Sequence, residues 1–169
     1  MSPLLVLVGP PGAGKTTVGR QVAEQLGVSF RDTDADVAAT AGKPIAEVFI
    51  DDGEDHFRTL EKAAVAMALA GHDGVLSLGG GAILAAETRE LLRGNRVVLL
   101  DVDLAAASSR VGLNRGRPGL ALNPRAMLKA LLDERMPLYL EVATDVVDTS
   151  KKPALQVADE VLALLASTS

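Results

Sequence analysis

Eight residues near the start of the chain, GPPGAGKT at positions 9–16, constrain the fold more than any other stretch. They match the pattern G-x-x-x-x-G-K-[ST] in full, between a short apolar run at positions 4–8 and a helical pattern at positions 15–26. A loop of this kind curls its backbone amides around phosphate oxygens, and the positive end of the following helix adds to their field. We therefore predict a phosphate-binding loop that follows a buried strand.

The residues of this loop indicate a nucleoside triphosphate with Mg²⁺. Lys15 is expected to reach the β- and γ-phosphates, and the Thr16 hydroxyl is expected to hold Mg²⁺. The nucleotide contacts are expected from Gly12, Ala13, Gly14, Lys15, Thr16 and Thr17. The chain has no N-K-x-D guanine motif, and its 169 residues leave little room for the machinery of a motor. Kinases that act on small molecules or on nucleotides remain.

Short β-rich runs alternate with helical patterns along the chain. Strands are predicted at residues 4–8, 28–32, 75–78, 96–102 and 145–148. Helices are predicted at residues 15–26, 35–41, 45–52, 54–70, 85–92 and 104–110, and two more open at Pro124 and Pro153. Aromatic residues make up only 2% of the chain, so Ala, Val, Leu and Ile must build the core. We predict one α/β domain, residues 1–169, with a doubly wound parallel sheet and ligands beyond the carboxyl ends of its strands.

The charge and the amino-acid counts argue against several kinds of partner. The net charge of −5 is unfavourable for binding nucleic acid or an anionic membrane. The chain has no cysteine, so neither a disulfide framework nor a thiolate metal site is possible. Its first residues lack a basic segment, and their apolar run is too short for a signal peptide or a membrane span. We expect a cytoplasmic protein and, because no long apolar stripe is left over, a monomer.

Two carboxylates follow the second predicted strand. If Asp32, Thr33 and Asp34 close that strand, both aspartates point to the same face. One could then act on the magnesium shell and the other on a substrate hydroxyl. The alternative is an acidic strand end in solvent, with Asp34 or Asp36 capping the next helix. Asp101, at the end of the apolar run VVLLD, competes for the role at the metal.

Two arginines on predicted helices could face an anion. Arg58 lies four residues after Glu54 and three before Glu61, and ion pairs within the helix are the simpler interpretation. Arg135 lies just before Pro137, where we expect a helix to kink or end. Taken singly, each arginine is more typical of a solvated surface charge than of a ligand.

Two glycine-rich stretches remain. The loop at residues 112–122 carries Arg115 and Arg117, and it is predicted to be a lid that excludes water and stabilises the transferring phosphoryl group. Its alternative is a mobile surface loop. The stretch LSLGGGAI at residues 76–83 places three glycines after the third strand. Three glycines cost conformational entropy, so they indicate either a structural turn or a pocket that needs bare backbone.

Some residues are expected to pack rather than to react. The helix at residues 54–70 should bury one face, made of Phe57, Leu60, Ala64 and Met67. Tyr139 is the only tyrosine and is expected to pack in the core. His56 and His72 are lone residues, and we assign them no chemistry.

Taken together, these motifs make the chain resemble shikimate kinase over nearly its whole length. The stretches that carry the resemblance, in the family's order and with similar spacing, are GPPGAGKT at 9–16, DTD at 32–34, FR at 57–58, GGG at 79–81, RP at 117–118 and RxPLY at 135–139. The resemblance implies a P-loop NTPase fold of the nucleoside monophosphate kinase type, a three-layer α/β/α arrangement with a five-stranded parallel sheet in the order 2-3-1-4-5. It also implies phosphoryl transfer from ATP to shikimate, with Mg²⁺ as cofactor.

The resemblance assigns the acceptor side of the site residue by residue. Asp34 would hydrogen-bond the ring hydroxyls, while Arg58 and Arg135 would hold the carboxylate. Gly79, Gly80 and Gly81 would line the pocket, where a side chain would block the ring and bare amides can bind its oxygens. Helices at about residues 34–61 would form the substrate-binding part.

The resemblance assigns the phosphoryl-transfer side in the same way. The catalytic residues would be Lys15, Asp34 and Arg117. Lys15 and Arg117 would stabilise charge on the moving phosphoryl group, and Arg117 would also contact the substrate. Thr16 would bind Mg²⁺, with Asp32 acting on it through water. The adenine contacts would come from Arg110 and Pro153.

One departure and two alternatives stay open. The family usually reads R-P-L-L in the lid, whereas this chain has RPGLA at residues 117–121, and Gly119 could loosen the closed lid. The acceptor could be another small hydroxy acid such as gluconate, or a nucleoside monophosphate, although DTD with GGG suits a compact polyol ring. A catalytically inactive, shikimate-kinase-like binding module is the second alternative, and the presence of Lys15, Thr16 and Asp32 argues against it.

Overall fold

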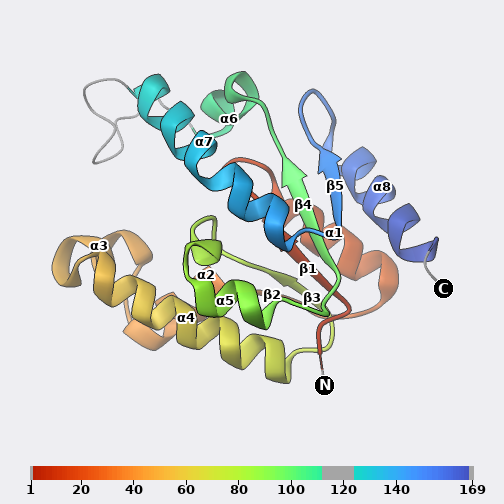
Figure 1. Cartoon of the computed structure of the whole chain (residues 1–169). Coiled ribbons are helices and arrows are strands. Elements are labelled where there is room, and N and C mark those ends of the chain that lie inside the picture. The colour runs from red at the N-terminus through yellow and green to blue at the C-terminus, as the bar shows by residue number, and fades with distance from the viewer. Residues whose placement is uncertain (1, 112–123, 168–169) are drawn as a thin grey trace.

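The computed structural model describes residues 2–111 and 124–167, and it shows a parallel sheet between layers of helices (Figure 1). The strands are β1 (Leu5–Val8), β2 (Phe30–Asp32), β3 (Val75–Ser77), β4 (Val97–Asp101) and β5 (Asp145–Asp148). They form a five-stranded sheet in the order β2-β3-β1-β4-β5, which confirms the predicted order. The phosphate loop thus follows the central strand, and the segments after β2 and β3 end on one side of it.

The helices are α1 (Lys15–Leu26), α2 (Thr33–Ala41), α3 (Ile45–Asp52), α4 (Glu54–Gly71), α5 (Ala86–Leu91), α6 (Leu104–Val111), α7 (Pro124–Val142) and α8 (Ala154–Ala166), with a 3-10 turn, η1, at Ala82–Leu84. Asp103 caps α6, since its Oδ1 accepts the Ala106 N–H at 2.7 Å. Gly27 ends α1 at a φ of 67°, and the Val28 N–H bonds to the Ala23 oxygen at 3.0 Å. This cap uses Val28, so β2 begins at Phe30, two residues later than predicted.

Alternate residues of the strands pack into two cores, one on each face of the sheet. One core holds Leu5, Leu7, Val75, Val98 and Leu100 against α1, α6, α8 and the first half of α7. The other holds Val6, Val8, Leu76, Val97 and Leu99 against α4, η1 and Tyr139 of α7. A smaller cluster of Val37, Val48, Phe57 and Ala64 joins α2, α3 and α4. Small aliphatic side chains therefore build the core, as the composition predicts.

Two details of the helices differ from the prediction. Met67 is 68% exposed, because it lies about 80° around α4 from the buried Phe57, outside the stripe that faces the sheet. The chain does not end a helix at Pro137 either, since α7 runs through it to Val142. Both parts of α7 are anchored in the sheet cores, with Leu132 in one core and Tyr139 in the other, and this packing outweighs the helix-breaking tendency of proline.

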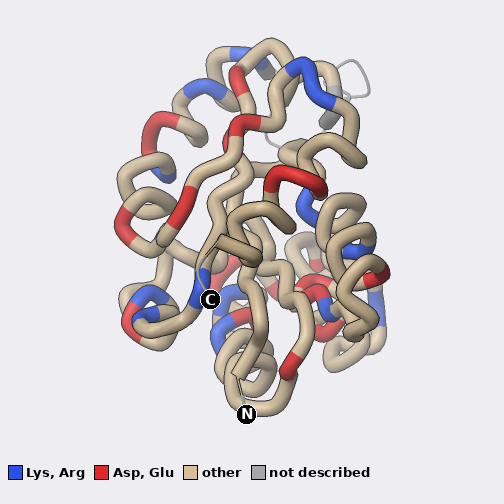
Figure 2. The backbone as a smooth tube through the Cα atoms, turned by 90° about the vertical axis from the view of Figure 1, so that its right-hand side faces the viewer, with Lys and Arg blue, Asp and Glu red and all other residues tan. Residues whose placement is uncertain are grey.

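Charged residues of both signs are interspersed along the backbone (Figure 2). Because no single-sign face dominates this view, anion binding must depend on the few cations that the fold brings to one place. In the part of the chain that the structure describes, no helix combines the length and the apolar character that crossing a membrane requires.

Candidate active site

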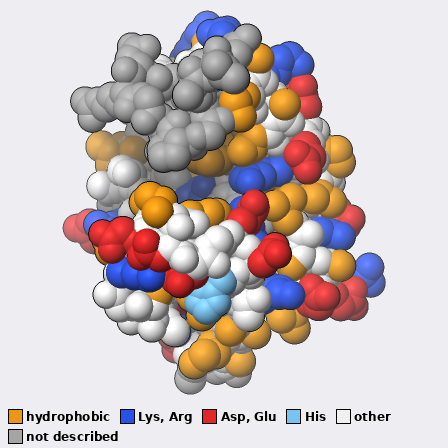
Figure 3. Space-filling model, turned by 90° about the vertical axis from the view of Figure 1, so that its left-hand side faces the viewer, with side chains coloured by type: hydrophobic (Ala, Val, Ile, Leu, Met, Phe, Trp, Pro, Cys, Tyr) orange, Lys and Arg blue, Asp and Glu red, His pale blue; other side chains and the backbone are white. Residues whose placement is uncertain are grey.

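Three loops meet at the carboxyl end of the sheet, where ligands are expected in this kind of fold. They follow β1, β2 and β3, which are neighbours in the sheet. Together they enclose a cavity of about 250 Å³ lined by Gly12, Gly14, Lys15, Thr16, Thr17, Asp32, Asp34, Ser77 and Leu78. The fold thus brings the predicted phosphate loop and the two predicted carboxylates to one place. In the space-filling view a hollow crosses one face, with Lys or Arg side chains inside it and Asp and Glu at its rim (Figure 3).

The phosphate loop has the backbone conformation that its glycines allow. Gly12 and Gly14 have φ angles of 83° and 88°, a left-handed conformation that glycine adopts without strain. α1 begins directly afterwards at Lys15, so its unpaired first amides face the loop. Lys15 Nζ donates to the backbone oxygens of Gly9 at 2.6 Å and Pro10 at 3.1 Å. The ammonium group is therefore held over the loop.

The Lys15 ammonium lies among charged neighbours. Burial lowers the pKa of Lys15 to about 8, whereas the carboxylates of Asp34 and Asp32 raise it and Arg135 lowers it. Lys15, Asp32 and Asp34 therefore face one another across one cavity.

The prediction that Asp32 and Asp34 share one face of a strand is wrong. β2 ends at Asp32 and α2 begins at Thr33, so Asp34 lies in the first turn of a helix. Asp32 is the N-cap, and its Oδ1 accepts the Asp34 N–H at 2.9 Å while its Oδ2 accepts the Thr16 hydroxyl at 3.2 Å. Aspartate is a strongly preferred N-cap residue, and here that preference ends the strand. Both carboxylates nevertheless line the cavity.

Asp34 has an unusual proton affinity. Burial raises the pKa of Asp34 to about 6, helped by Asp32 and Glu61 and opposed by Lys15 and Arg58. Such a carboxyl group is charged at neutral pH, yet it accepts a proton more readily than an ordinary aspartate. It is suited to orienting a hydroxyl group and accepting its proton.

The triple glycine at residues 79–81 lies where functional side chains approach the backbone. A Cβ at Gly79 would overlap Asp34 Oδ1, and a Cβ at Gly81 would overlap the guanidinium group of Arg58. None of the three glycines has a positive φ. The sequence therefore needs glycine here for space and not for backbone conformation.

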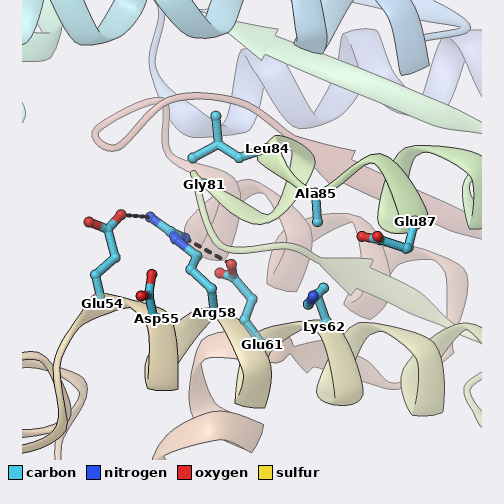
Figure 4. Close-up of a pocket in the computed structure, with 9 residues that line it drawn as sticks. All are labelled: Glu54, Asp55, Arg58, Glu61, Lys62, Gly81, Leu84, Ala85 and Glu87. Carbon is cyan, nitrogen blue, oxygen red and sulfur yellow. Dashed lines mark hydrogen bonds and ion pairs between the residues drawn. The ribbon is translucent and has the colours of Figure 1, made fainter.

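Arg58 is held by two glutamates of its own helix. Arg58 Nη1 donates to Glu61 Oε1 at 2.8 Å and Nη2 donates to Glu54 Oε1 at 3.4 Å (Figure 4). The predicted ion pairs within the helix are therefore confirmed. Glu61 is only 3% exposed, and burial raises its pKa although Arg58 opposes the shift. These residues line a second cavity of about 280 Å³, between α4 and the segment at residues 81–87 (Figure 4).

α7 brings Arg135 to the triple glycine. A Cβ at Gly80 would lie 3.6 Å from Arg135 Nη1, so the guanidinium group lies over this residue. Tyr139, one helical turn later, is fully buried and donates its hydroxyl hydrogen to the Gly80 oxygen at 2.6 Å. The prediction that Tyr139 packs in the core is confirmed, and its hydroxyl also holds the loop. The two residues lie one turn apart on the same side because α7 continues through Pro137.

Sequence reasoning missed two polar residues of the site. Thr33 is fully buried, and its Oγ1 accepts the Gly79 N–H at 3.2 Å. The Gly79 amide is thus already used, so only the other amides of the triple glycine fit the expectation that bare amides bind a ligand. The other missed residue is Glu61, whose burial the sequence does not reveal. Thr33 lies inside the DTD motif and Glu61 lies three residues after Arg58, so proximity to predicted site residues was the available signal.

A third cavity of about 250 Å³ lies on the other side of the phosphate loop. Its lining residues are Ala13, Gly14, Thr17, Val18, Thr149, Lys152, Ala154 and Val157. Gly14 and Thr17 border both this cavity and the first one, so the two adjoin along the loop. The predicted contact Pro153 lies between two of the lining residues. The side chain of Arg110, as well as Arg117 and the predicted lid at residues 112–122, lie outside the described residues.

Comparison with known proteins accounts for this set of features. The family model described as shikimate kinase matches residues 11–166. The shikimate kinase of Salinispora arenicola is 62% identical over 167 residues, which cover 99% of this chain and 100% of that protein. The chain belongs to the shikimate kinase family. It is therefore an ATP-dependent kinase, as its motifs predict.

Solved structures of the family agree with this assignment. The shikimate kinase of Acinetobacter baumannii, determined in complex with shikimate, matches with a TM-score of 0.92 and 38% identity, covering 100% of this chain and 95% of that one. The shikimate kinase of Aquifex aeolicus matches with a TM-score of 0.79 and 29% identity, covering 96% of each chain. The P-loop NTPase fold predicted from the resemblance is thereby confirmed.

Asp101, the second candidate for the metal, has structural contacts instead. Its Oδ1 accepts the Val102 N–H at 2.8 Å. Its backbone oxygen accepts the N–H of Thr149 at 2.8 Å and the hydroxyl of Thr149 at 2.9 Å. These bonds fix the ends of β4 and β5 beside the third cavity. Asp32 lines the cavity at the phosphate loop, and Asp101 is not among the residues that line it.

Thr16 and Asp32 fit a magnesium ion that is held partly by water. Among residues 2–111 and 124–167, no three His, Asp or Glu side chains gather into a metal site of their own. Mg²⁺ at a nucleotide needs only one or two protein oxygens, because phosphates and water supply the rest. The Thr16 hydroxyl and the Asp32 carboxylate, 3.2 Å apart at the phosphate loop, provide such a pair.

Proposed function

We propose that this chain transfers the γ-phosphoryl group of Mg-ATP to the 3-hydroxyl of shikimate, giving ADP and 3-phosphoshikimate. One observation carries the proposal: Asp34 shares a cavity with Lys15 on one side and meets Glu61 and Gly79 on the other. A hydroxyl bound at Asp34 would face the phosphates, while the rest of the acceptor would extend towards the arginines. The Acinetobacter relative solved with shikimate supports this acceptor.

In this proposal Arg58 and Arg135 hold the carboxylate of shikimate. Their guanidinium groups lie over Gly81 and Gly80, so they approach the same turn from two different helices. A guanidinium fork matches the two oxygens of a carboxylate and stays charged at all relevant pH values. Gly79, Gly80 and Gly81 line the pocket because a side chain at this turn would displace the groups that bind the acceptor.

Phosphoryl transfer in this proposal depends on positioning and charge. Its transition state is loose and needs little help from a strong base. Lys15 stabilises negative charge on the phosphoryl group, and Asp34 orients the 3-hydroxyl and accepts its proton late in the reaction. Arg117 is proposed to add a second cation and to contact the substrate, and the lid at residues 112–122 to exclude water. These last assignments rest on the family motif.

Magnesium and the nucleotide base are assigned to opposite ends of the phosphate loop. Thr16 would hold Mg²⁺, with Asp32 acting on it through water. When bound, the metal would neutralise charge on the β- and γ-phosphates. The backbone of Gly12, Ala13 and Gly14 would surround the phosphates, and Thr17 would contact the nucleotide. The adenine would occupy the third cavity, next to Pro153 and Arg110.

We further propose that the protein is a cytoplasmic monomer without nucleic-acid or membrane partners. The net charge of −5 and the mixture of both signs along the backbone support this (Figure 2). Among the residues that the structure describes, the most exposed large apolar side chains are Ile50, Met67 and Leu155, which lie on three different helices. Sedimentation velocity would report the oligomeric state directly.

The acceptor can be tested with a panel of candidate substrates. ADP release from Mg-ATP would be measured with shikimate, quinate, gluconate, AMP and CMP. We expect strong turnover with shikimate alone, because two arginines and Asp34 match a carboxylate and a ring hydroxyl. Turnover with another acceptor and none with shikimate would overturn the proposal. No turnover with any of them, despite ATP binding, would favour the inactive binding module.

The shifted pKa values of Asp34 and Lys15 predict the pH dependence of the reaction. We expect kcat/KM for shikimate, at saturating Mg-ATP, to rise with pH up to about 6, because the Asp34 carboxyl is protonated below that value. We expect kcat/KM for ATP to fall above about pH 8, because free Lys15 then loses the proton that gives it its charge. Initial rates from pH 5 to pH 9.5 would measure both limbs.

The Asp34→Asn variant serves as the control for this profile. The asparagine side chain has no carboxyl group, so the acidic limb should disappear. The alkaline limb assigned to Lys15 should remain and move to lower pH, because the Asp34 charge that raises the pKa of Lys15 is lost. An unchanged acidic limb in the residual activity of the variant would show that another group controls it.

A further inference from the structure

We propose that Tyr139 is a positioning residue for the acceptor. Its hydroxyl holds the Gly80–Gly81 peptide beside Arg135 so that a guanidinium group and backbone amides converge on one carboxylate. The inference rests on the proposed function and deepens it, because it names the group that sets the geometry of the shikimate pocket.

The phenol of Tyr139 is bonded to the triple glycine. Tyr139 is fully buried and donates its hydroxyl hydrogen to the Gly80 oxygen at 2.6 Å. Arg135 lies one helical turn earlier on α7, and its Nη1 would lie 3.6 Å from a Cβ at Gly80. The hydroxyl therefore connects the helix that carries Arg135 to the triple glycine.

The bond to Gly80 orients the amides of the turn. The described part of the chain has no cis peptide bond, so the Gly80 oxygen and the Gly81 N–H point in opposite directions. The Gly81 N–H thus points away from Tyr139. The Gly79 oxygen accepts the Ala82 N–H at 3.0 Å. The Gly80 N–H belongs to the same trans peptide as this oxygen, so it points away from Ala82.

These two amides have no acceptor in the described protein. Neither the Gly80 N–H nor the Gly81 N–H donates a hydrogen bond to any residue within 2–111 and 124–167. Gly81 is buried and Gly80 is half-buried, and buried amides are nearly always paired with protein or with a bound group. Arg135 Nη1 would lie only 3.6 Å from a Cβ at Gly80, so a cation and the two donors lie at the same turn. An anionic oxygen is the acceptor that satisfies them all.

The structure separates the role of the hydroxyl from the role of the ring. The ring fills the core beside β1, β3 and β4, a task that phenylalanine could perform equally well. Only the hydroxyl can donate to the Gly80 oxygen. Without it, the Gly80–Gly81 peptide loses the bond that fixes its direction beside Arg135.

The first test is the variant Tyr139→Phe. We expect KM for shikimate to rise about tenfold, as for the loss of one hydrogen bond, while KM for ATP stays within about twofold. A merely structural role would reduce the amount of active enzyme and leave both KM values unchanged. A KM for shikimate within about twofold of wild type, or a parallel rise of both KM values, would overturn the proposal.

Thr144→Val is the matched control for this variant. The Thr144 hydroxyl also donates to a backbone oxygen, that of Val97 at 2.9 Å, but at the amino ends of β4 and β5. Its loss should lower the melting temperature and change neither KM. A rise of KM for shikimate in this control would mean that the effect of Tyr139→Phe reflects general loosening, which would also overturn the proposal.

A second measurement works on the intact side chain. Tyr139 is the only tyrosine, so incorporation of 3-fluorotyrosine gives a single ¹⁹F resonance from this phenol. An anion at the Gly81 N–H polarises the same peptide whose oxygen binds the phenol, so shikimate should shift the resonance, and Mg-ADP should shift it far less. No shift at saturating shikimate would overturn the positioning role. Failure of the proposed function is distinguishable from failure of this positioning role, because the wild-type protein would then not phosphorylate shikimate at all.

Discussion

Replacing Asp34 by Asn is expected to lower kcat by about a hundredfold to a thousandfold and, at the same time, to stabilise the protein. The loss of activity follows from the position of Asp34 between Lys15 and the acceptor pocket, where an amide cannot accept the proton of the 3-hydroxyl. The effect should stay below that of removing a strong general base, because the transition state is loose. Steady-state kinetics with saturating shikimate and Mg-ATP would measure it.

The gain in stability follows from the raised pKa of Asp34. The pKa rises from 3.8 in the unfolded chain to about 6 in the folded state, so the folded state disfavours the charged form. A rise of this size corresponds to at most roughly 3 kcal/mol, and partial exposure of Asp34 reduces it to about 1–2 kcal/mol. The charged carboxylate therefore lowers the free energy of unfolding by the full amount above about pH 6 and has no effect on it below about pH 4. Asp34→Asn should raise the free energy of unfolding at pH 7.5 and leave it unchanged at pH 3.5.

Asp36→Asn is the matched control, since it makes the same substitution two residues later in α2. Asp36 accepts a hydrogen bond from Arg31 Nε at 2.7 Å, at a partly exposed position. Its loss should cost less than about 1 kcal/mol and leave kcat unchanged. If Asp34→Asn keeps wild-type kcat, or if it destabilises the protein at neutral pH, the assignment of Asp34 as a buried, hydroxyl-orienting carboxylate is wrong.

The parts of the fold that depend on local patterns could be predicted from the sequence. The phosphate loop needs its glycines and Lys15 in one continuous stretch, and the strands show as apolar runs because both faces of the sheet are covered. The chain order of the strands alone does not determine their order in the sheet, which came from the resemblance to a known family. The identity of the acceptor also came from this resemblance, because neither Arg58 nor Arg135 has a local sequence feature that distinguishes it from a surface charge.

The parts that could not be predicted depend on contacts between distant segments. The bond between Tyr139 and Gly80 joins positions 59 residues apart, and no spacing rule connects them. The burial of Glu61 depends on how α4 lies against the triple glycine. The placement of Asp34 on the strand was wrong for a different reason, since the N-cap preference of Asp32 competes with strand alternation and wins. Local sequence holds both tendencies, and only the tertiary structure shows which one prevails.

The triple glycine provides the second large effect. Gly79→Ala is expected to lower kcat/KM for shikimate at least about a hundredfold and to leave KM for ATP within about twofold. An alanine Cβ there would overlap Asp34 Oδ1 and lie 2.9 Å from Glu61 Oε2, so the Asp34 carboxylate must move. Misplacing a reacting group by about 1 Å can cost about a hundredfold in rate. The backbone of Gly79 has no positive φ, so alanine adds no strain beyond this contact.

Gly71→Ala separates this local effect from the general effect of adding a methyl group. Gly71 is the last residue of α4, it has no positive φ, and a Cβ there meets nothing within 4 Å. Alanine at this position should leave the kinetics unchanged and stabilise the helix end by up to about 1 kcal/mol. Wild-type kcat/KM for shikimate in Gly79→Ala would show that Asp34 is not held against this turn during the reaction. The close approach of the Asp34 carboxylate to the bare backbone would then have no role in catalysis, and the reason for the first of the three glycines would have to be sought in folding.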